Sequence, residues 1–474
     1  MNAIIGALTL ALVVGILLFV PTLAAPYQSV YGPVTLASCG TALGLCAVTA
    51  LAAGIAIKRN RDDGSYLVKL FLLALLVRLA IGTVIFVSNG QDFFGGDAWT
   101  YDFFGYQQLL AWRGDKYAQI LVERFVGGGY RSGWGMVSMV AAIYGIVGRN
   151  MLAVQFFNAV IGAATAPVIF LCAKEVFHNR RVAATAAIAV AFYPSLMLWS
   201  SQGLKDGPIV FFLALSILAT LRLGQKISML YLVVAVLALF GVLAFRFYVF
   251  YMLVAAIAGA FIIGMRPVTA QSIARQLIVV VFLGLSLTYF GVTRYATAQF
   301  EEYGSLEQVQ RSRLNAATSA ESGFNRDVDV STTSGALLTI PVGVVYLLFA
   351  PFPWQLATLR QSLTLPEMVV WWASFPLLIL GLWFSLKHRL RQMFPILIFT
   401  SMLTIAYSVF QGNVGTAYRQ RAQLLVFYFI FVAVGAVLVL EKREERRRRA
   451  AEESRLASFG LRASLLRRQT EPPA

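Results

Sequence analysis

The stretch GGDAWTYDFFGY, residues 95–106, brings carboxylates, glycines and aromatic rings together directly after an apolar run. If a helix starts at Asp97, its period carries Tyr101, Phe104 and Gln108 round to the face of this carboxylate. Sugars are often held by a carboxylate beside a phenol and an aromatic surface. We therefore expect Asp97 to be a functional carboxylate, with Tyr101 and Gln108 as contacts of a bound sugar.

Other side chains near Asp97 are open to more than one interpretation. Trp99 could contact the sugar or acceptor, whereas Trp134 fits the aromatic belt of a membrane interface better. Asp97 could also serve as the N-cap of the helix, where a carboxylate satisfies free amides and suits the helix dipole. Asp92 and Asp102 are weaker candidates, because a helix turns Asp102 away from Asp97.

A second group of polar residues lies in FYPSLMLWSSQGLKDGPIVFF, residues 192–212, where one apolar run ends and the next begins. Acidic residues are nearly absent from the apolar runs, so Asp206 at the end of one is a candidate functional group. Lys205 precedes it. Alternatively, Asp206 only caps the following helix, with Gly207 and Pro208 in its first turn.

Arginines form a third group in GNVGTAYRQRAQ, residues 412–423, next to the last apolar run. We expect Arg419 and Arg421 to face outward there, and Arg246 in FRFYVF is similar. The fork-shaped guanidinium suits phosphate. The commoner alternative is an arginine that only extends to lipid headgroups.

The elements that position these residues are membrane helices. Hydrophobic residues make up 59% of the 474 residues and charged residues only 13%, which indicates an all-α polytopic membrane protein. A spanning helix needs roughly 20 apolar residues. About twelve runs suit spans: 3–23, 34–57, 68–88, 152–173, 182–199, 208–222, 228–244, 248–264, 277–292, 367–385, 392–410 and 424–440.

Loop charge predicts the sides of the membrane. Basic clusters at 58–61, 174–181, 386–391 and from 441 onward all become cytoplasmic if the short runs 132–147 and 335–350 lie along the outer face. Both chain ends are then cytoplasmic. All three groups of candidate residues fall on the opposite, outer side.

Several functions are disfavoured by the composition. The formal charge of +17 is spread over short loops and the tail, which is a topological pattern and not a nucleic-acid surface. The cysteines lie in apolar runs without metal spacing: Cys39, Cys46 and Cys172. The two histidines, His178 and His388, both lie in basic loops, so imidazole catalysis and a His-ligated zinc are not expected.

Three motifs in order suggest a family. They are GDAWTY in the first large outer loop, P-S-x-x-x-W-S-S-x-x-x-K-D at 194–206, and N-x-G-T-x-x-R-x-R at 413–421. Together they resemble the GT-C superfamily of polyprenyl-phosphate-sugar-dependent glycosyltransferases. The nearest members are family 39-like bacterial enzymes related to protein mannosyltransferases and aminoarabinose transferases, and the resemblance covers about residues 66–440.

The resemblance implies roles for the candidate residues. Asp97 would be the general base, and Asp206 would match a second acidic position near the lipid phosphate. The cations that could stabilise the departing phosphate are Lys205, Arg246, Arg419 and Arg421. Family members often carry two adjacent acidic residues where this chain has Gly96 and Asp97. No metal site is therefore predicted, and a divalent cation stays an unsupported alternative.

The predicted function is an inverting transfer of a sugar from a polyprenyl-phosphate-linked donor to a hydroxyl or amine of a glycan, lipid or protein. It would take place at the extracytoplasmic face of the cell (inner) membrane. Residues 66–440 would form the catalytic domain, with outer loops 89–151 and 293–366, after two extra helices in 1–65 and before a basic tail, 441–474. The alternatives are a polysaccharide polymerase or ligase that uses a lipid-linked oligosaccharide, and a transporter or flippase. A transporter would show ionisable groups at mid-membrane.

Overall fold

The structure is a computed structural model of the chain. It describes residues 2–27, 32, 34–94, 96–127, 133–263, 269–289, 291–318, 323–324, 328–356 and 358–470. Gly95, which belongs to the first motif, lies outside the described residues.

Every regular element in these ranges is a helix, which confirms the all-α prediction. The helices before the bend at Tyr193 are α1 (Asn2–Leu23), α3 (Leu36–Lys58), α4 (Gly64–Val87), α5 (Asp97–Trp112), α6 (Lys116–Val126), α7 (Trp134–Val147), α8 (Met151–Phe177) and α9 (Arg180–Phe192). Those after it are α10 (Pro194–Ser200), α11 (Asp206–Leu223), α12 (Met229–Phe245), α13 (Phe247–Ile263), α14 (Ala270–Tyr289), α15 (Val292–Tyr303), α16 (Leu306–Thr318), α17 (Thr333–Phe349), α18 (Leu359–Ser362), α19 (Leu365–His388), α20 (Leu390–Phe410), α21 (Val414–Gln420) and α22 (Ala422–Thr470).

The chain is a multi-pass membrane protein. Within the described ranges, eight helices are long and apolar enough to cross a membrane: α1, α3, α4, α8, α11, α19, α20 and α22. The run 182–199, expected as one span, consists instead of α9 and α10, which are bent by 55°. The bend falls at Tyr193, directly before Pro194, because a residue before proline is pushed out of the helical conformation.

Five further helices have shorter apolar stretches, at 10–17 residues: α7, α12, α13, α14, whose stretch is counted from Ile273, and α17. Three of them, α12 to α14, belong to the twelve runs predicted to span. The runs 132–147 and 335–350 were expected to be helices too short for a span. They form α7, with 14 residues, and α17, with 17 residues.

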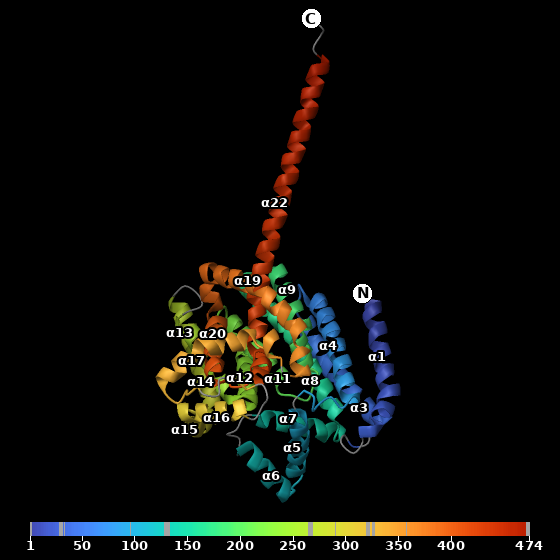
Figure 1. Cartoon of the computed structure of the whole chain (residues 1–474), viewed down its shortest axis with the longest axis vertical. Coiled ribbons are helices and arrows are strands. Elements are labelled where there is room, and N and C mark those ends of the chain that lie inside the picture. The colour runs from blue at the N-terminus through green and yellow to red at the C-terminus, as the bar shows by residue number, and fades with distance from the viewer. Residues whose placement is uncertain are drawn as a thin grey trace.

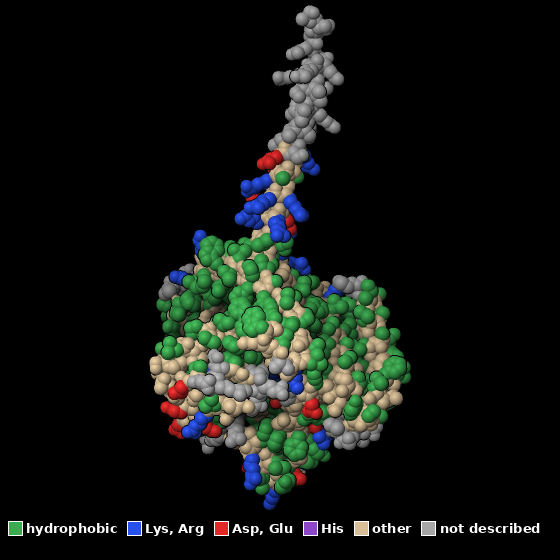
Figure 2. Space-filling view, viewed as in Figure 1, with side chains coloured by type: hydrophobic (Ala, Val, Ile, Leu, Met, Phe, Trp, Pro, Cys, Tyr) green, Lys and Arg blue, Asp and Glu red, His purple; other side chains and the backbone are tan. Residues whose placement is uncertain are grey.

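The helices form one bundle with two different ends. Figure 1 shows α5, α6 and α7 together at one end and the long α22 extending from the other. On the face in view, hydrophobic side chains cover much of the body, while acidic and basic side chains gather near α5 to α7 and along the tail (Figure 2). The outer-loop candidates and the basic tail therefore lie at opposite ends of the bundle, as the loop charges predicted.

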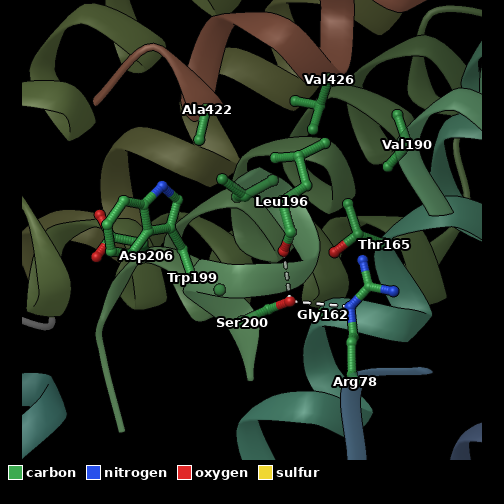
Figure 3. A pocket seen from close by; sticks show the side chains of 12 residues that line it. Arg78, Gly162, Thr165, Val190, Leu196, Trp199, Ser200, Asp206, Ala422 and Val426 are labelled. Carbon is green, nitrogen blue, oxygen red and sulfur yellow. Dashed lines mark hydrogen bonds between the residues drawn. The ribbon is translucent and has the colours of Figure 1, made fainter. Parts of the chain in front are cut away.

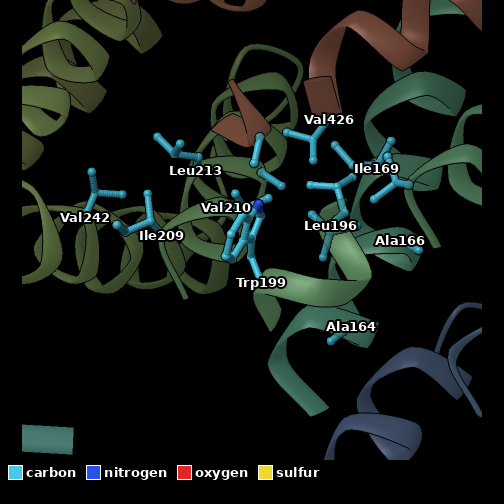
Figure 4. Close-up of a cluster of buried hydrophobic side chains, with 14 of the residues drawn as sticks. Ala164, Ala166, Ile169, Leu196, Trp199, Ile209, Val210, Leu213, Val242 and Val426 are labelled. Carbon is cyan, nitrogen blue, oxygen red and sulfur yellow. The ribbon is translucent and has the colours of Figure 1, made fainter. Parts of the chain in front are cut away.

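Buried side chains of the core lie next to the loop 201–205, which precedes Asp206. Trp199 of α10 packs there with Val210 of α11 and Val426 of α22 (Figure 4), and all three are buried. Small residues bring the backbones close: a Cβ on Gly162 of α8 would lie 2.3 Å from the Cβ of Ser200. Helices in membranes associate through such small residues, so α8, α10 and α11 hold the loop 201–205 in a fixed place.

Candidate functional site

The first candidate, Asp97, opens helix α5. The N-cap of that helix is Gly96, which has a left-handed φ of 72°, and no side chain caps it. The prediction that Asp97 could be the N-cap is therefore wrong, because the carboxylate lies one residue further on, in the first turn. The positive end of the helix dipole still stabilises the negative charge of Asp97 there. The Asp97 side chain is 49% exposed.

The second candidate, Asp206, opens helix α11 but is buried. Its side chain is only 2% exposed. The N-cap of α11 is Lys205, again without a side-chain capping bond, so the capping alternative for Asp206 is also wrong. Ion pairs satisfy this carboxylate instead.

Arg419 of α21 joins the two aspartates. Its Nη1 lies 2.5 Å from Oδ2 of Asp97, and its Nε and Nη2 lie 2.7 Å and 2.6 Å from Oδ2 of Asp206. Burial alone would lower the pKa of Arg419, but the charges of Asp206 and Asp97 raise this pKa above its usual range. The guanidinium is thus a fixed cation between a buried and an exposed carboxylate.

Arg246 approaches Asp206 from the other side. It is buried between α12 and α13, with its Nη2 3.4 Å from Oδ1 of Asp206 and its Nη1 donating to the hydroxyl of Tyr407 at 3.3 Å. Tyr407 in turn donates to Oε1 of Gln423 at 3.0 Å. The sequence analysis selected neither residue: Tyr407 lies within an apolar run, and Gln423 is the last, uncharged residue of the stretch 412–423.

A third cation, Lys205, lies beside Tyr101. A Cβ on Gly133 would lie 3.6 Å from Nζ of Lys205 and 3.5 Å from the hydroxyl of Tyr101, so both groups face the same glycine. Burial, together with the positive charge of Arg246, lowers the pKa of Lys205 to about 7. Burial and the nearby charge of Asp97 raise the pKa of Tyr101, which therefore stays a neutral phenol.

A pocket of about 310 Å³, counting the space open to solvent, adjoins this cluster. Figure 3 shows Asp206, Trp199 and Arg78 around it, with aliphatic side chains from α9 and α22 on the other side. The Trp199 ring also lies under the guanidinium of Arg419, 5.6 Å from its centroid. The site thus combines an apolar pocket with charged groups at its edge.

Arg78 of α4 was missed by the sequence reasoning, although it is a charged residue in the middle of an apolar run. It is 1% exposed. Its Nε donates to the Ser200 hydroxyl at 2.8 Å, and its Nη1 donates to the carbonyls of Ala191 at 2.8 Å and Ala74 at 3.0 Å. Arg78 therefore ties together the two helices on either side of the bend at Tyr193.

Arg421 does not lie with Arg419. It is buried, at 1% exposed, and its role as a phosphate contact stays a prediction. Its Nη1 donates to the carbonyl of Leu348 at 2.8 Å, and its guanidinium lies 5.0 Å from the ring of Tyr418. A step of two positions turns a side chain by about 200° around a helix, so Arg419 and Arg421 point into different surroundings.

Other residues of helix α5 pack against neighbouring helices or form ion pairs away from Asp97. Phe104 stacks on Phe125 of α6 with ring centroids 3.8 Å apart, so it holds the two helices together. Asp102 is buried and pairs with Tyr144 and with Arg149, which agrees with its lower rank as a candidate. Trp99 and Gln108 are partly buried, and their roles as sugar or acceptor contacts stay predictions.

The arrangement of charges could bind an anion and accept a proton. The carboxylates of Asp97 and Asp206 face the cations of Arg246 and Arg419, and Lys205 adds positive charge when it is protonated. In the described ranges, no group of three or more His, Cys, Asp or Glu side chains is placed to hold a metal ion. The cation that lies between Asp97 and Asp206 is a guanidinium.

The fold and this site define a multi-pass helical membrane protein with a charged centre at one end of its bundle. Residues 136–290, from α7 to the end of α14, match the family model described as dolichyl-phosphate-mannose-protein mannosyltransferase. The match covers 155 of the 474 residues, about a third of the chain, and agrees with the resemblance that the motifs predicted. Among curated proteins, no sequence matches the chain.

One solved structure with a similar arrangement is the archaeal oligosaccharyltransferase AglB from Archaeoglobus fulgidus, in complex with an inhibitory peptide and a dolichol-phosphate. The sequence identity is 14% and the TM-score is 0.41, over 68% of this chain and 44% of that chain. The chain thus spans less than half the length of the archaeal enzyme. A likeness of this size is too weak to place individual site residues.

Proposed function

We propose that the protein transfers a sugar from a polyprenyl-phosphate-linked donor to an acceptor hydroxyl or amine, with Asp97 as the general base. One observation carries the proposal: Asp97 and Asp206 share the guanidinium of Arg419, but only Asp97 is exposed. Asp206 can therefore hold the cations in place while Asp97 meets an acceptor. The matched family, whose description names a dolichyl-phosphate-linked mannose, supports the class of donor.

The donor phosphate would interact with the cations around Asp206. A phosphate and a carboxylate bind the guanidinium fork in the same way, so a donor phosphate can replace Asp97 on Nη1 of Arg419. Arg246 and Lys205 add charge that stabilises the phosphate as it leaves.

The reaction then needs one proton acceptor. The acceptor oxygen or nitrogen attacks the anomeric carbon from the side opposite the phosphate, and its proton passes to the Asp97 carboxylate. The bond between the anomeric carbon and the phosphate oxygen breaks, and its electron pair leaves with the polyprenyl phosphate. Configuration at the anomeric carbon is inverted. Because a guanidinium separates Asp97 from Asp206, we derive no step through a metal ion.

The proposed location follows from the two ends of the bundle. The site lies with α5 to α7, and the basic tail extends from the opposite end (Figure 1). Basic loops favour the cytoplasm. We therefore place the site at the extracytoplasmic face of the cell membrane and both chain ends in the cytoplasm, with a glycan, lipid or protein as acceptor.

Glycan analysis of cells tests the proposal. Cells without the gene are complemented with the wild-type chain, Asp97→Asn or Asp92→Asn, and their envelope glycans and glycoproteins are compared by mass spectrometry. Asp92 is the matched control, an exposed carboxylate in the same loop. The loss of general-base catalysis is expected to slow transfer by about 10²- to 10⁴-fold, so only Asp97→Asn should fail to restore the product.

Two results would contradict different parts of this proposal. If deletion of the gene changes no glycan, the protein is not a glycosyltransferase of these products. If Asp97→Asn restores the product as well as Asp92→Asn does, the transfer stands but the base is another residue. Equal expression of the variants, measured by immunoblot of the membranes, is the control.

A further inference from the structure

A second, larger pocket opens at the other end of the bundle. It has a volume of about 1330 Å³, counting the space open to solvent, and lies where α8, α11 and α19 end and α20 begins. The neighbouring turn is tied to the tail helix, because Nη1 of Arg181 lies 3.0 Å from Oε2 of Glu444. The pocket is therefore on the face opposite Asp97.

The charged lining of this pocket is mainly basic. Both histidines of the chain lie in it, together with Lys387 and Arg391. The acidic residue of the lining is Glu175, and its carboxylate is already neutralised by Nε of Arg222 at 2.6 Å. An anion that enters the pocket therefore meets a positive field.

Basic residues at this face have a simpler explanation, which is orientation of the chain in the membrane. The histidine and lysine at the end of α19 also suit the negative end of a helix. Neither explanation requires that residues from three separate segments line one concave site. His178 belongs to the turn after α8, Lys387 to the end of α19, and Arg391 to the start of α20.

The rim of the pocket is apolar. Leu386 and Leu390 line it and are 45% and 41% exposed. Trp383, one helical turn before Lys387, is 58% exposed, and Nζ of Lys387 lies 5.1 Å from its ring centroid. An exposed tryptophan beside a lysine is typical of the depth at which lipid headgroups lie.

We propose that this pocket binds the phosphate group of an anionic membrane lipid, held by Lys387, Arg391, His178 and His388, with the acyl chains along Leu386 and Leu390. The site is separate from the proposed transfer reaction and does not depend on it. Phosphate is the shared chemistry of two sources, a lipid headgroup and a soluble phosphate compound. The apolar rim favours the lipid.

Binding of short-chain lipids to the purified full-length protein tests the site. Titration calorimetry in a neutral detergent would compare a short-chain phosphatidylglycerol, the phosphatidylcholine of the same chain length, and glycerol phosphate. We expect the wild-type protein to bind the phosphatidylglycerol more tightly than the other two. The double variant Lys387→Gln/Arg391→Gln should weaken this binding by about tenfold or more, because it removes two charge-assisted contacts.

The matched control is Lys442→Gln/Arg443→Gln, which removes the same charge from the exposed tail helix and should leave the affinity unchanged. Equal weakening by both double variants, or no binding of phosphatidylglycerol by the wild type, would overturn the proposal. Equal affinity for glycerol phosphate would contradict the lipid as the source. All four substituted side chains are exposed. An unchanged gel-filtration profile shows that each double variant is folded. If a double variant aggregates, the corresponding single variants replace it.

Discussion

Two buried aspartates at opposite ends of the bundle each pair with two basic side chains, but in different surroundings. Asp63, at the N-cap of α4, is 3% exposed and accepts from Lys174 and Arg180, each at 2.7 Å. Asp206, at the start of α11, is 2% exposed and pairs with Arg246 and Arg419. Each carboxylate therefore meets two cations, but the cations differ in their access to water.

The cations of Asp63 extend into solvent, with side-chain exposures of 32% for Lys174 and 61% for Arg180. Those of Asp206 are 5% and 15% exposed. A solvated cation that loses its partner is hydrated, whereas a buried one is left with an unpaired charge. The cluster around Asp63 thus acts as a clamp between helices, while the cluster around Asp206 holds cations that require an anion.

The strongest test of this difference removes each carboxylate in turn. Asp206→Asn leaves Arg246 buried without a carboxylate and leaves Arg419 with Asp97 alone, so we expect a loss of about 3–5 kcal/mol. Asp63→Asn should cost about 1 kcal/mol, since Lys174 and Arg180 can turn to water. The two variants are compared by their apparent melting temperatures, measured on the purified proteins in the same detergent. Similar shifts would show that solvent access does not distinguish the clusters.

A second test uses the pH dependence of phosphate binding. The pKa of Lys205 is lowered to about 7, so the side chain is protonated below this pH and loses its charge above it. Affinity for a polyprenyl phosphate should therefore be highest below pH 7 and fall by up to about tenfold per pH unit above it. This affinity can be measured by the quenching of tryptophan fluorescence, because Trp199 lies beside Arg419.

Two variants sharpen this pH test. Lys205→Arg keeps its charge at all accessible pH values, and its affinity should no longer fall above pH 7. Lys174→Gln, in the cluster around Asp63, should retain the wild-type profile. A fall in affinity that persists in Lys205→Arg would assign the titration to another group.

The sequence predicted the helices well because each apolar run must satisfy its backbone internally. It also predicted that Asp97 and Tyr101 share a helical face and that the candidate residues lie at the end opposite the tail. The bend at Tyr193 carried a signal, Pro194, which the apolar pattern concealed. The lengths of α12 and α13, 17 residues each and at the lower limit for a span, could not be judged from hydropathy alone.

The site itself was less accessible to sequence reasoning. The ion pair between Arg419 and Asp97 joins residues 322 positions apart, and no local pattern contains that contact. Arg421 was grouped with Arg419 by its position, although a helix sends the two in different directions. Arg78 could have been found, because a single arginine within an apolar run is costly unless it has a specific role.

The smallest expected effect concerns the glycine beside Lys205. Gly133 has a φ of +98° and Gly114 a φ of +99°, so alanine at either position adopts a left-handed conformation at a cost of about 1–2 kcal/mol. A Cβ on Gly114 meets nothing within 4 Å, whereas one on Gly133 meets Lys205 and Tyr101. Both variants should lower the melting temperature by similar amounts. Only Gly133→Ala should also weaken binding of the polyprenyl phosphate, by a few-fold, since its methyl group occupies the space between the two polar groups. If Gly114→Ala weakens binding equally, the effect arises from strain in the outer loop and not from the cluster around Asp206.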